Sequence, residues 1–386
     1  MMKKLFLPLL LLVAVSAQAA DKNPVLSIEG GKVQGVLADD HPEVFVYRGI
    51  PYAAPPIREN RWKAPQPVLP WKGVKICDTF GRPSYQAIQY TGGYYTEWGY
   101  GKEAAFSEDC LYLNVWTKAP GQVNKKLPVA LWIHGGGYRE GWGSEPEFDG
   151  QEWGAKDVVL VTINYRLGVF GFLTHPLLAA ENPHHVSGNY GILDQIEALK
   201  WIKKNIAQFG GDPNNVTIFG QSAGGGSVRT LCESPLARGL FHKAVIMSAQ
   251  GLSIPDANGN PMGGRYSGGS VADAEANAKK VFDWAGLTDL QKMRAASTET
   301  VFALPTLYYQ VNSDGQQGGG MPFMRGLPFM PMIDGYVSEK SFDDATRQGT
   351  LADVPYMIGF TLNDMGNMAP NIAEFCKVRG EKGGKA

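Results

Sequence analysis

A serine between two glycines is the residue of this sequence best placed to do chemistry. Ser222 lies at the centre of the segment Gly-Gln-Ser-Ala-Gly at 220–224, after a short apolar run and before further small residues. Flanking glycines let the chain turn sharply from a strand into a helix and hold the serine in a strained backbone conformation. Such a hydroxyl can attack a carbonyl carbon when a base, usually histidine, accepts its proton. We therefore expect Ser222 to be a nucleophile for acyl transfer.

A glycine-rich segment further upstream could supply the donors that this chemistry needs. His134-Gly135-Gly136-Gly137 directly follows the apolar run 129–133. Without Cβ atoms, glycines allow backbone N–H groups to point into a site. The N–H groups of Gly136, Gly137 and Ala223 would form a three-donor oxyanion hole. An ordinary glycine turn is the alternative for this segment taken alone, and His134 is interpreted as a residue that shapes the loop.

The sequence offers a candidate for the acid of the site but none for the base. Asp364 follows an apolar run at 355–360, where an acid that orients the base is expected, although an aspartate that caps a turn is a competing interpretation. No histidine occupies the required place after the acid, and His242 follows Ser222 too soon. No histidine spacing indicates a metal site, and no cofactor is expected. The histidines of the chain are His41, His134, His175, His184, His185 and His242.

Unbroken apolar runs predict the strands that must position these residues. They cover 129–133, 158–163, 216–219 and 244–247, and the sheet resumes at 355–360. Runs without alternation are typical of strands buried on both faces. Their order with the helices predicts an α/β fold with a central, mostly parallel sheet and helices on both faces. Ser222 then lies at the carboxyl end of a strand, where such sheets place their sites.

A single apolar stripe predicts the main helix before the elbow. The stripe residues recur at helical spacing and are Ile192, Ile196, Leu199, Ile202 and Ile206. A second helix is expected around 271–284, within a glycine-rich excursion at 250–330 that would shape the pocket. The aromatic residues Tyr90, Tyr94, Tyr95, Trp98 and Tyr100 either line the mouth of that pocket or pack against one another.

Composition restricts the classes of partner. The chain has 386 residues, 44% hydrophobic and 19% charged, which is typical of a globular protein with a large core. A net charge of −1 provides no electrostatic attraction for nucleic acid or an anionic membrane. Four cysteines, Cys77, Cys110, Cys232 and Cys376, allow three full pairings, and four free thiols are an equal alternative.

The N-terminus has the pattern of a secretory signal peptide. Lys3 and Lys4 precede the apolar run 5–15, and Ala17-Gln18-Ala19 is a small-x-small cleavage site. The apolar run is too short to span a bilayer. We expect a signal peptide at 1–19, an exported protein that is periplasmic or secreted without a membrane anchor, and a single domain at 20–386.

Several segments together resemble the type B carboxylesterase family. The segments 209–213 and 220–224 are similar to its serine signature, and 108–115, which reads Glu-Asp-Cys-Leu-Tyr-Leu-Asn-Val, is similar to its second signature. Further matches lie at 48–53, 164–168 and 188–191. The resemblance extends from about Gly30 to Gly366.

This resemblance implies an α/β-hydrolase fold and an enzyme that acts on small-molecule carboxylic esters. The aromatic residues between Tyr90 and Tyr100 would favour aryl esters where they line the mouth of the pocket. The resemblance implies Ser222 as the nucleophile and Gly136, Gly137 and Ala223 as oxyanion donors. It also supports Asp364 as the acid, at a position where the family more often has glutamate.

The chain departs from the family pattern in three ways. Relatives often pair Cys110 with a cysteine where this chain has Ser84, and cholinesterases have glutamate where it has Gln221, which weakens the case for a cationic choline substrate. The family also continues well beyond its acid to its histidine, whereas this chain ends 22 residues after Asp364, and its ending at 377–385 resembles a polar tail. We therefore expect a C-terminally truncated member without its last strands, whose activity is open. The alternatives are a non-catalytic binding or adhesion module, or an inactive fragment, on the same fold.

Overall fold

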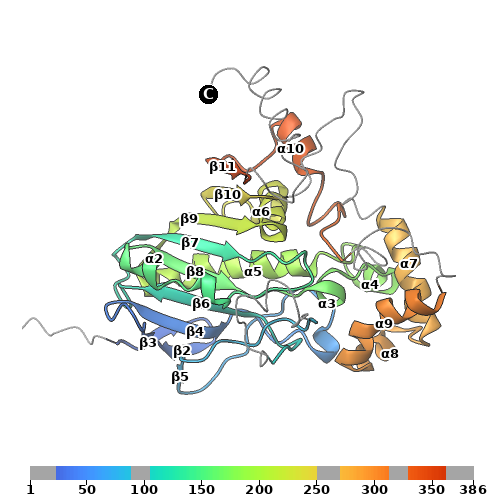
Figure 1. The fold of residues 1–386 in the computed structure, drawn as a ribbon, viewed down its shortest axis with the longest axis horizontal. Coiled ribbons are helices and arrows are strands. Elements are labelled where there is room, and N and C mark those ends of the chain that lie inside the picture. Colours follow the sequence, from blue (N-terminus) through green and yellow to red (C-terminus); the bar gives the residue numbers. More distant parts are fainter. Residues whose placement is uncertain (1–22, 88–104, 250–269, 313–328, 362–386) are drawn as a thin grey trace, which may run out of the picture.

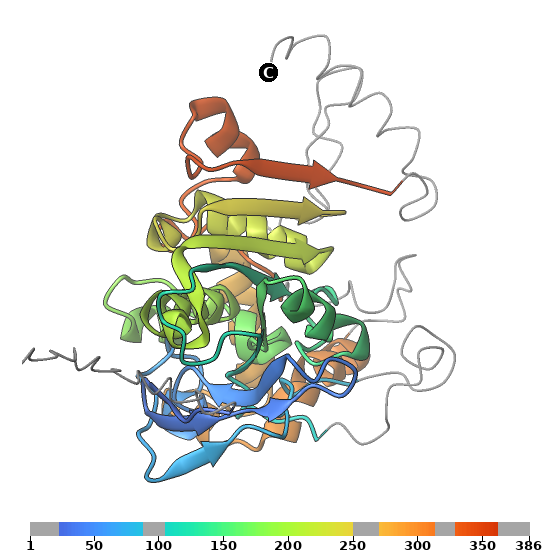
Figure 2. The ribbon, with the colours of Figure 1, turned by 90° about the vertical axis from the view of Figure 1, so that its left-hand side faces the viewer.

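A single eight-stranded sheet organises the molecule (Figure 1). The computed structural model describes residues 23–87, 105–249, 270–312 and 329–361. Within these residues the strand order is β11-β10-β9-β7-β8-β6-β4-β3, and Figure 2 shows them stacked from the blue strands to the red β11. The strands are β3 (Val36–Leu37), β4 (Phe45–Pro51), β6 (Tyr112–Thr117), β7 (Leu127–Ile133), β8 (Val159–Ile163), β9 (Gly211–Gln221), β10 (Lys243–Met247) and β11 (Tyr356–Gly359).

The sheet has a parallel half and an antiparallel half. β8, β7, β9, β10 and β11 run parallel to their neighbours, whereas β6 pairs antiparallel with β8 and β4, and β4 pairs antiparallel with β3. The predicted fold, with a mostly parallel central sheet, is confirmed. A second, small sheet joins β1 (Leu26–Ile28), β2 (Gly31–Gln34) and β5 (Val74–Ile76).

Helices cover both faces of the large sheet. α2 (Gln151–Ala155) contacts β6 and β8, whereas α6 (Ala223–Glu233) contacts β7, β9 and β10, and α5 (Tyr190–Asn205) contacts β9. α5 is the helix that the isoleucine stripe predicts, and its stripe residues are buried. The remaining helices are α3 (Gly168–Phe172), α4 (Pro176–Glu181), α7 (Val271–Trp284), α8 (Leu290–Ala295), α9 (Thr298–Asn312) and α10 (Phe342–Gln348).

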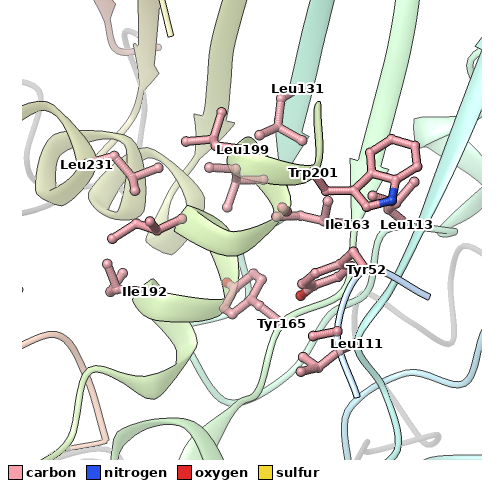
Figure 3. Close-up of a cluster of buried hydrophobic side chains, with 14 of the residues drawn as sticks. Tyr52, Leu111, Leu113, Leu131, Ile163, Tyr165, Ile192, Leu199, Trp201 and Leu231 are labelled. Carbon is pink, nitrogen blue, oxygen red and sulfur yellow. The ribbon is translucent and has the colours of Figure 1, made fainter. Parts of the chain in front are cut away.

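Alternate side chains of β7 enter two different cores. Leu131 and Ile133 belong to the large core beneath α5 and α6, in which Leu199 and Leu231 also lie (Figure 3). Trp132 points to the opposite face and belongs to a smaller core with Trp116 and Leu160. Because a strand places successive side chains on opposite faces, two-sided burial explains the unbroken apolar run in the sequence.

The excursion after β10 contributes helices that share the large core. α7, α8 and α9 gather at one end of the molecule, on the right in Figure 1. Phe282, Met293, Val301 and Leu304 from these helices are buried among the core residues. No helix in the described part of the chain is long and apolar enough to cross a membrane.

β11 forms one edge of the sheet as far as the structure describes it. Met357 and Ile358 are 69% and 47% exposed, although the strand continues the parallel half. Parallel strands are normally covered on both faces, so the exposed side chains of β11 are unusual for their position.

A buried ion pair fastens the segment after β8 to helix α5. Arg166 donates to both carboxylate oxygens of Asp194, from Nη2 to Oδ1 at 2.6 Å and from Nε to Oδ2 at 2.8 Å. The backbone N–H of Arg166 also donates to Asp194 Oδ2, and Nη1 donates to the carbonyl of Lys63. The two side chains are only 2% and 0% exposed. Such a pair is costly to break because the remaining charge has no water to solvate it.

Replacement of Asp194 by asparagine should therefore destabilise the protein strongly. We expect Asp194→Asn to lower the free energy of unfolding by about 3–5 kcal/mol, since Arg166 then remains charged and buried. Denaturant unfolding followed by tryptophan fluorescence measures this loss. Glu197→Gln on the same helix is the matched control, because the Glu197–Lys200 pair is on the surface. It should cost at most about 0.5 kcal/mol, and equal losses for the two variants would contradict the interpretation.

Candidate active site

Ser222 occupies a strained turn between β9 and α6. Its backbone has φ 56° and ψ −123°, outside the regions that residues with side chains normally adopt. The Ser222 N–H donates to the carbonyl of Met247 on β10 at 3.0 Å, and its carbonyl accepts from the N–H of Gly226 at 2.9 Å. These bonds hold the strained residue from both sides, as the sequence pattern predicts for a nucleophile.

The glycines around Ser222 are required by backbone contact. A Cβ atom placed on Gly220 would lie 2.6 Å from the carbonyl carbon and oxygen of Gly224. A Cβ atom placed on Gly224 would lie 2.1 Å from the carbonyl oxygen of Ile133 on β7. The backbones of β7, β9 and α6 therefore touch one another, and no larger residue fits at either position.

The glycine loop after β7 lies directly beside the serine. β7 pairs with β9, so the ends of the two strands meet at the same edge of the sheet. A Cβ atom placed on Gly135 would lie 3.4 Å from Cβ of Ser222. Gly136 and Gly137 have φ of 92° and 62°, in the left-handed region that favours glycine. The structure thus brings together the two glycine segments that the sequence analysis selected.

Three N–H groups of this region remain available to a ligand. Within the described part of the chain, the N–H groups of Gly136, Gly137 and Ala223 donate to no protein acceptor. A Cβ atom placed on Gly137 would contact nothing within 4 Å, so the loop borders open space there. Backbone donors that are fixed and unused can stabilise a developing oxyanion without reorganising.

His134 supports the glycine loop instead of contacting the serine. Its ring stacks on Tyr165 with 4.4 Å between ring centroids, and its carbonyl accepts from Tyr165 Oη at 2.9 Å. Burial lowers the pKa of the His134 ring to about 4, although the nearby Gly135 carbonyl opposes the shift. His134 is thus neutral at neutral pH, and this placement agrees with its interpretation as a loop-shaping residue.

Two polar side chains hold the C-terminal part of the glycine loop in place. Gln86 is 4% exposed and both accepts from the N–H of Gly141 at 2.8 Å and donates to its carbonyl at 3.1 Å. Asn164 accepts from the N–H of Gly143 at 2.8 Å. The segment after β8 adds a third link, because the N–H of Gly168 donates to the carbonyl of Tyr138 at 2.7 Å. Together these bonds fix the loop at both ends.

A buried carboxyl group lies behind the loop. Glu145 is 5% exposed and accepts from the N–H of Trp142 at 2.9 Å. Burial raises the pKa of the Glu145 carboxyl to about 8, the Trp142 N–H opposes the shift, and Glu147 and Glu140 add to it. The group is therefore mainly protonated at pH 7. Sequence reasoning missed Gln86, Glu145 and Asn164, although Asn164 lies in a segment that resembles the carboxylesterases.

The six histidines, all of which are described, do not reach Ser222. None of their rings hydrogen bonds to the Ser222 hydroxyl. His41 contacts Glu43 and Glu152, His242 Nδ1 accepts from the N–H of Val216, and His184 stacks on Tyr336. His175 is buried and accepts from the N–H of Leu177.

Some predicted residues fall outside the described part of the chain. Asp364 lies in 362–386, as does Cys376, and the aromatic residues from Tyr90 to Tyr100 lie in 88–104. The three described cysteines, Cys77, Cys110 and Cys232, are buried free thiols. In the described ranges no group of three or more His, Cys, Asp or Glu residues is arranged to hold a metal ion.

The comparisons with known proteins agree on one family. The Carboxylesterase family matches residues 22–382. The chain is 36% identical over 348 residues to fumonisin B1 esterase of Sphingopyxis macrogoltabida, which covers 90% of this chain and 57% of the relative. It is 45% identical over 343 residues to para-nitrobenzyl esterase of Bacillus subtilis (strain 168), and the match covers 88% of this chain and 63% of that relative.

Solved structures show the same similarity. The carboxylesterase of Geobacillus stearothermophilus superimposes with a TM-score of 0.70 at 34% sequence identity, covering 92% of this chain and 66% of that structure. The chain thus spans about three fifths of the length of the curated relatives named above. Because the family match, the sequence identity and the fold agree over nearly the whole chain, the protein belongs to the carboxylesterase family.

Proposed function

We propose that this protein is built for the hydrolysis of carboxylic esters through an acyl-enzyme on Ser222. The observation that carries the proposal is the set of unused N–H groups on Gly136, Gly137 and Ala223 beside a strained serine. Family membership supports the same chemistry.

The chemistry would run in two halves. Ser222 Oγ attacks the ester carbonyl carbon while its proton passes to a base, and the three N–H groups donate hydrogen bonds to the carbonyl oxygen as it becomes negative. The C–O bond to the alcohol then breaks, the alcohol leaves with a proton, and the acyl group remains on Ser222. Water attacks the acyl-enzyme in the second half, releasing the acid and restoring the serine.

The base that Ser222 needs is not identified in this chain. None of its six histidines hydrogen bonds to Ser222, and the proposed acid Asp364 lies outside the described residues. We propose that the chain of 386 residues keeps the nucleophile and the oxyanion donors but lacks the histidine that makes turnover fast.

The substrate class is proposed as a small-molecule carboxylic ester. One relative is named for para-nitrobenzyl esters, which supports an aromatic ester as the finer proposal.

A fluorophosphonate probe should label Ser222. The phosphorus atom mimics the tetrahedral carbonyl centre, so the serine oxygen displaces fluoride, the hydroxyl proton passes to water, and the product is stabilised by the oxyanion donors. Peptide mapping by mass spectrometry should place the label on Ser222, and Ser222→Ala should abolish it. Ser248→Ala is the matched control, because Ser248 also has a positive φ, of 45°, at the end of the next strand, and should leave labelling unchanged.

The same protein should hydrolyse a p-nitrophenyl ester far more slowly than a complete serine hydrolase. A serine hydrolase without its base loses on the order of 10⁴–10⁶-fold in kcat. Fast turnover that Ser222→Ala removes would show that another base serves Ser222. Absence of labelling even at high pH, where hydroxide can remove the serine proton, would instead contradict the nucleophile itself and favour a non-catalytic role.

Gly136→Ala should slow the labelling of Ser222 by about 10²-fold, the usual effect of losing one oxyanion donor. The new Cβ would lie 2.1 Å from the carbonyl oxygen of Glu140, so the loop must move. Labelling rates from intact-mass time courses measure the effect. Gly73→Ala is the control, because Gly73 has a similar φ of 74° and no atom within 4 Å of the added Cβ. Equal rates in the two variants would exclude Gly136 as a donor.

We also propose that residues 1–19 are a signal peptide and that the mature protein is exported, to the periplasm or beyond. The positive residues, the short apolar run and the Ala17-Gln18-Ala19 site support this. Expression in a Gram-negative host should yield a protein whose intact mass corresponds to cleavage after Ala19, recovered by osmotic shock. An uncleaved chain in the cytoplasm would refute the proposal, and Ala19→Arg should block cleavage.

A further inference from the structure

Arg139 is a half-buried cation without an oxygen partner. Among the described residues its guanidinium makes no ion pair and no hydrogen bond, and its one charge-related contact is with the ring of Phe329, 5.7 Å from the ring centroid. An aromatic ring attracts a cation but accepts none of the five hydrogen bonds that a guanidinium offers.

The other arginines of comparable burial are all bonded to oxygen. Arg61 pairs with Glu108, Arg166 with Asp194, Arg229 with Asp343 and Arg294 with Glu181, and Arg48 donates to the carbonyl of Asp78. Arg139 is therefore the exception within the described part of the chain. None of its nitrogens is among the buried polar atoms without a partner, so its donors are open to solvent and to a ligand.

The position of Arg139 connects it with the ester site. It lies two residues after Gly137, and its own N–H donates to the carbonyl of Gly136 at 3.0 Å. The same glycine loop runs beside Ser222, where the Gly135 position approaches the serine Cβ to 3.4 Å. A side chain that starts from this loop begins close to the place where an acyl group must sit. The Phe329 ring, which is 8% exposed, gives the guanidinium a fixed surface.

The charge of Arg139 is not neutralised by its acidic neighbour. Glu140 follows directly in the chain but forms no ion pair with Arg139. Its side chain turns toward Gly136, where its Cγ lies 3.1 Å from the position of an added Cβ. Burial lowers the pKa of the Arg139 guanidinium and raises the pKa of the Glu140 carboxyl, so both groups lack compensation from charged partners. An arginine nevertheless stays protonated in a protein.

We propose that Arg139 binds a carboxylate carried by the substrate, so that the site prefers esters with a free acid group over neutral esters of the same size. A guanidinium and a carboxylate can form two parallel hydrogen bonds, which gives the pair both strength and direction. The inference rests on the proposed function, because it names the class of ester that Ser222 would attack.

Two fluorophosphonate probes of equal length test this preference without requiring turnover. One ends in a carboxylate and the other in the corresponding primary amide, which has nearly the same shape but no charge. Intact-mass time courses give the rate at which each probe labels Ser222, and the ratio of the two rates measures the preference. Thermal unfolding of each variant establishes that it is folded.

The wild-type chain should label faster with the carboxylate probe. Arg139→Gln should lower the rate ratio by roughly tenfold or more, as expected for the loss of hydrogen bonds to a charged group. Arg139→Lys should keep part of the preference, because lysine retains the charge but not the planar fork. High salt should reduce the wild-type ratio only slightly if the pair is shielded from solvent.

Arg48→Gln is the matched control. Arg48 is also half-buried and also lies over a phenylalanine ring, Phe80, at 5.2 Å, but it belongs to β4. The control should leave the rate ratio unchanged. A wild-type ratio near one, or a ratio that Arg139→Gln does not change, overturns the inference while Ser222 labelling still supports the proposed function. If neither probe labels Ser222, the proposed function and the inference fail together.

Discussion

Three backbone segments meet at contact distance beneath Ser222, and the rest of the site depends on this meeting. The carbonyl of Ile133 at the end of β7 leaves no room for a side chain on Gly224, and Gly224 leaves none on Gly220. This proximity forces the sharp turn that presents the serine, and it places the loop after β7 next to the serine. The strained backbone of Ser222 persists because the close-packed strands around it hold it in this conformation.

Polar groups extend this rigidity from the sheet to the loop. The bidentate Arg166–Asp194 pair fixes the segment after β8 to α5, and that segment in turn binds the carbonyl of Tyr138. Gln86 binds both polar groups of the Gly141 backbone from the opposite side. Because Arg166, Asp194 and Gln86 are buried, a shift of the loop would leave several polar groups unsatisfied, which keeps the oxyanion donors at fixed positions before a substrate arrives.

Sequence patterns predicted the strands, the main helix and the glycine segments, because each of these follows from a local physical rule. Unbroken apolar runs identified β7, β8, β9 and β10, and the isoleucine stripe identified α5, because burial leaves a periodic record in the sequence. The elbow and the glycine loop were found because only glycine fits there. The partners of Gln86, Glu145 and Arg139 were not predicted, since contacts between residues far apart in the chain leave no local pattern. Asp364, which follows the strand at 355–360 and lies outside the described residues, stays a prediction.

The open edge of β11 affects how the protein behaves in concentrated solution. Within the described residues no further strand pairs with the outer side of β11, where Met357 and Ile358 are exposed. An edge of this kind can template the strand of another polypeptide, and natural sheets usually shield it with a charge, a proline or a covering helix. Where no other part of the chain covers this edge, self-association through β11 would compete with the monodisperse state as the protein concentration rises. The strand that limits solubility would then be β11, which lies at the opposite edge of the sheet from β3 and two strands away from β9, the strand that leads to Ser222.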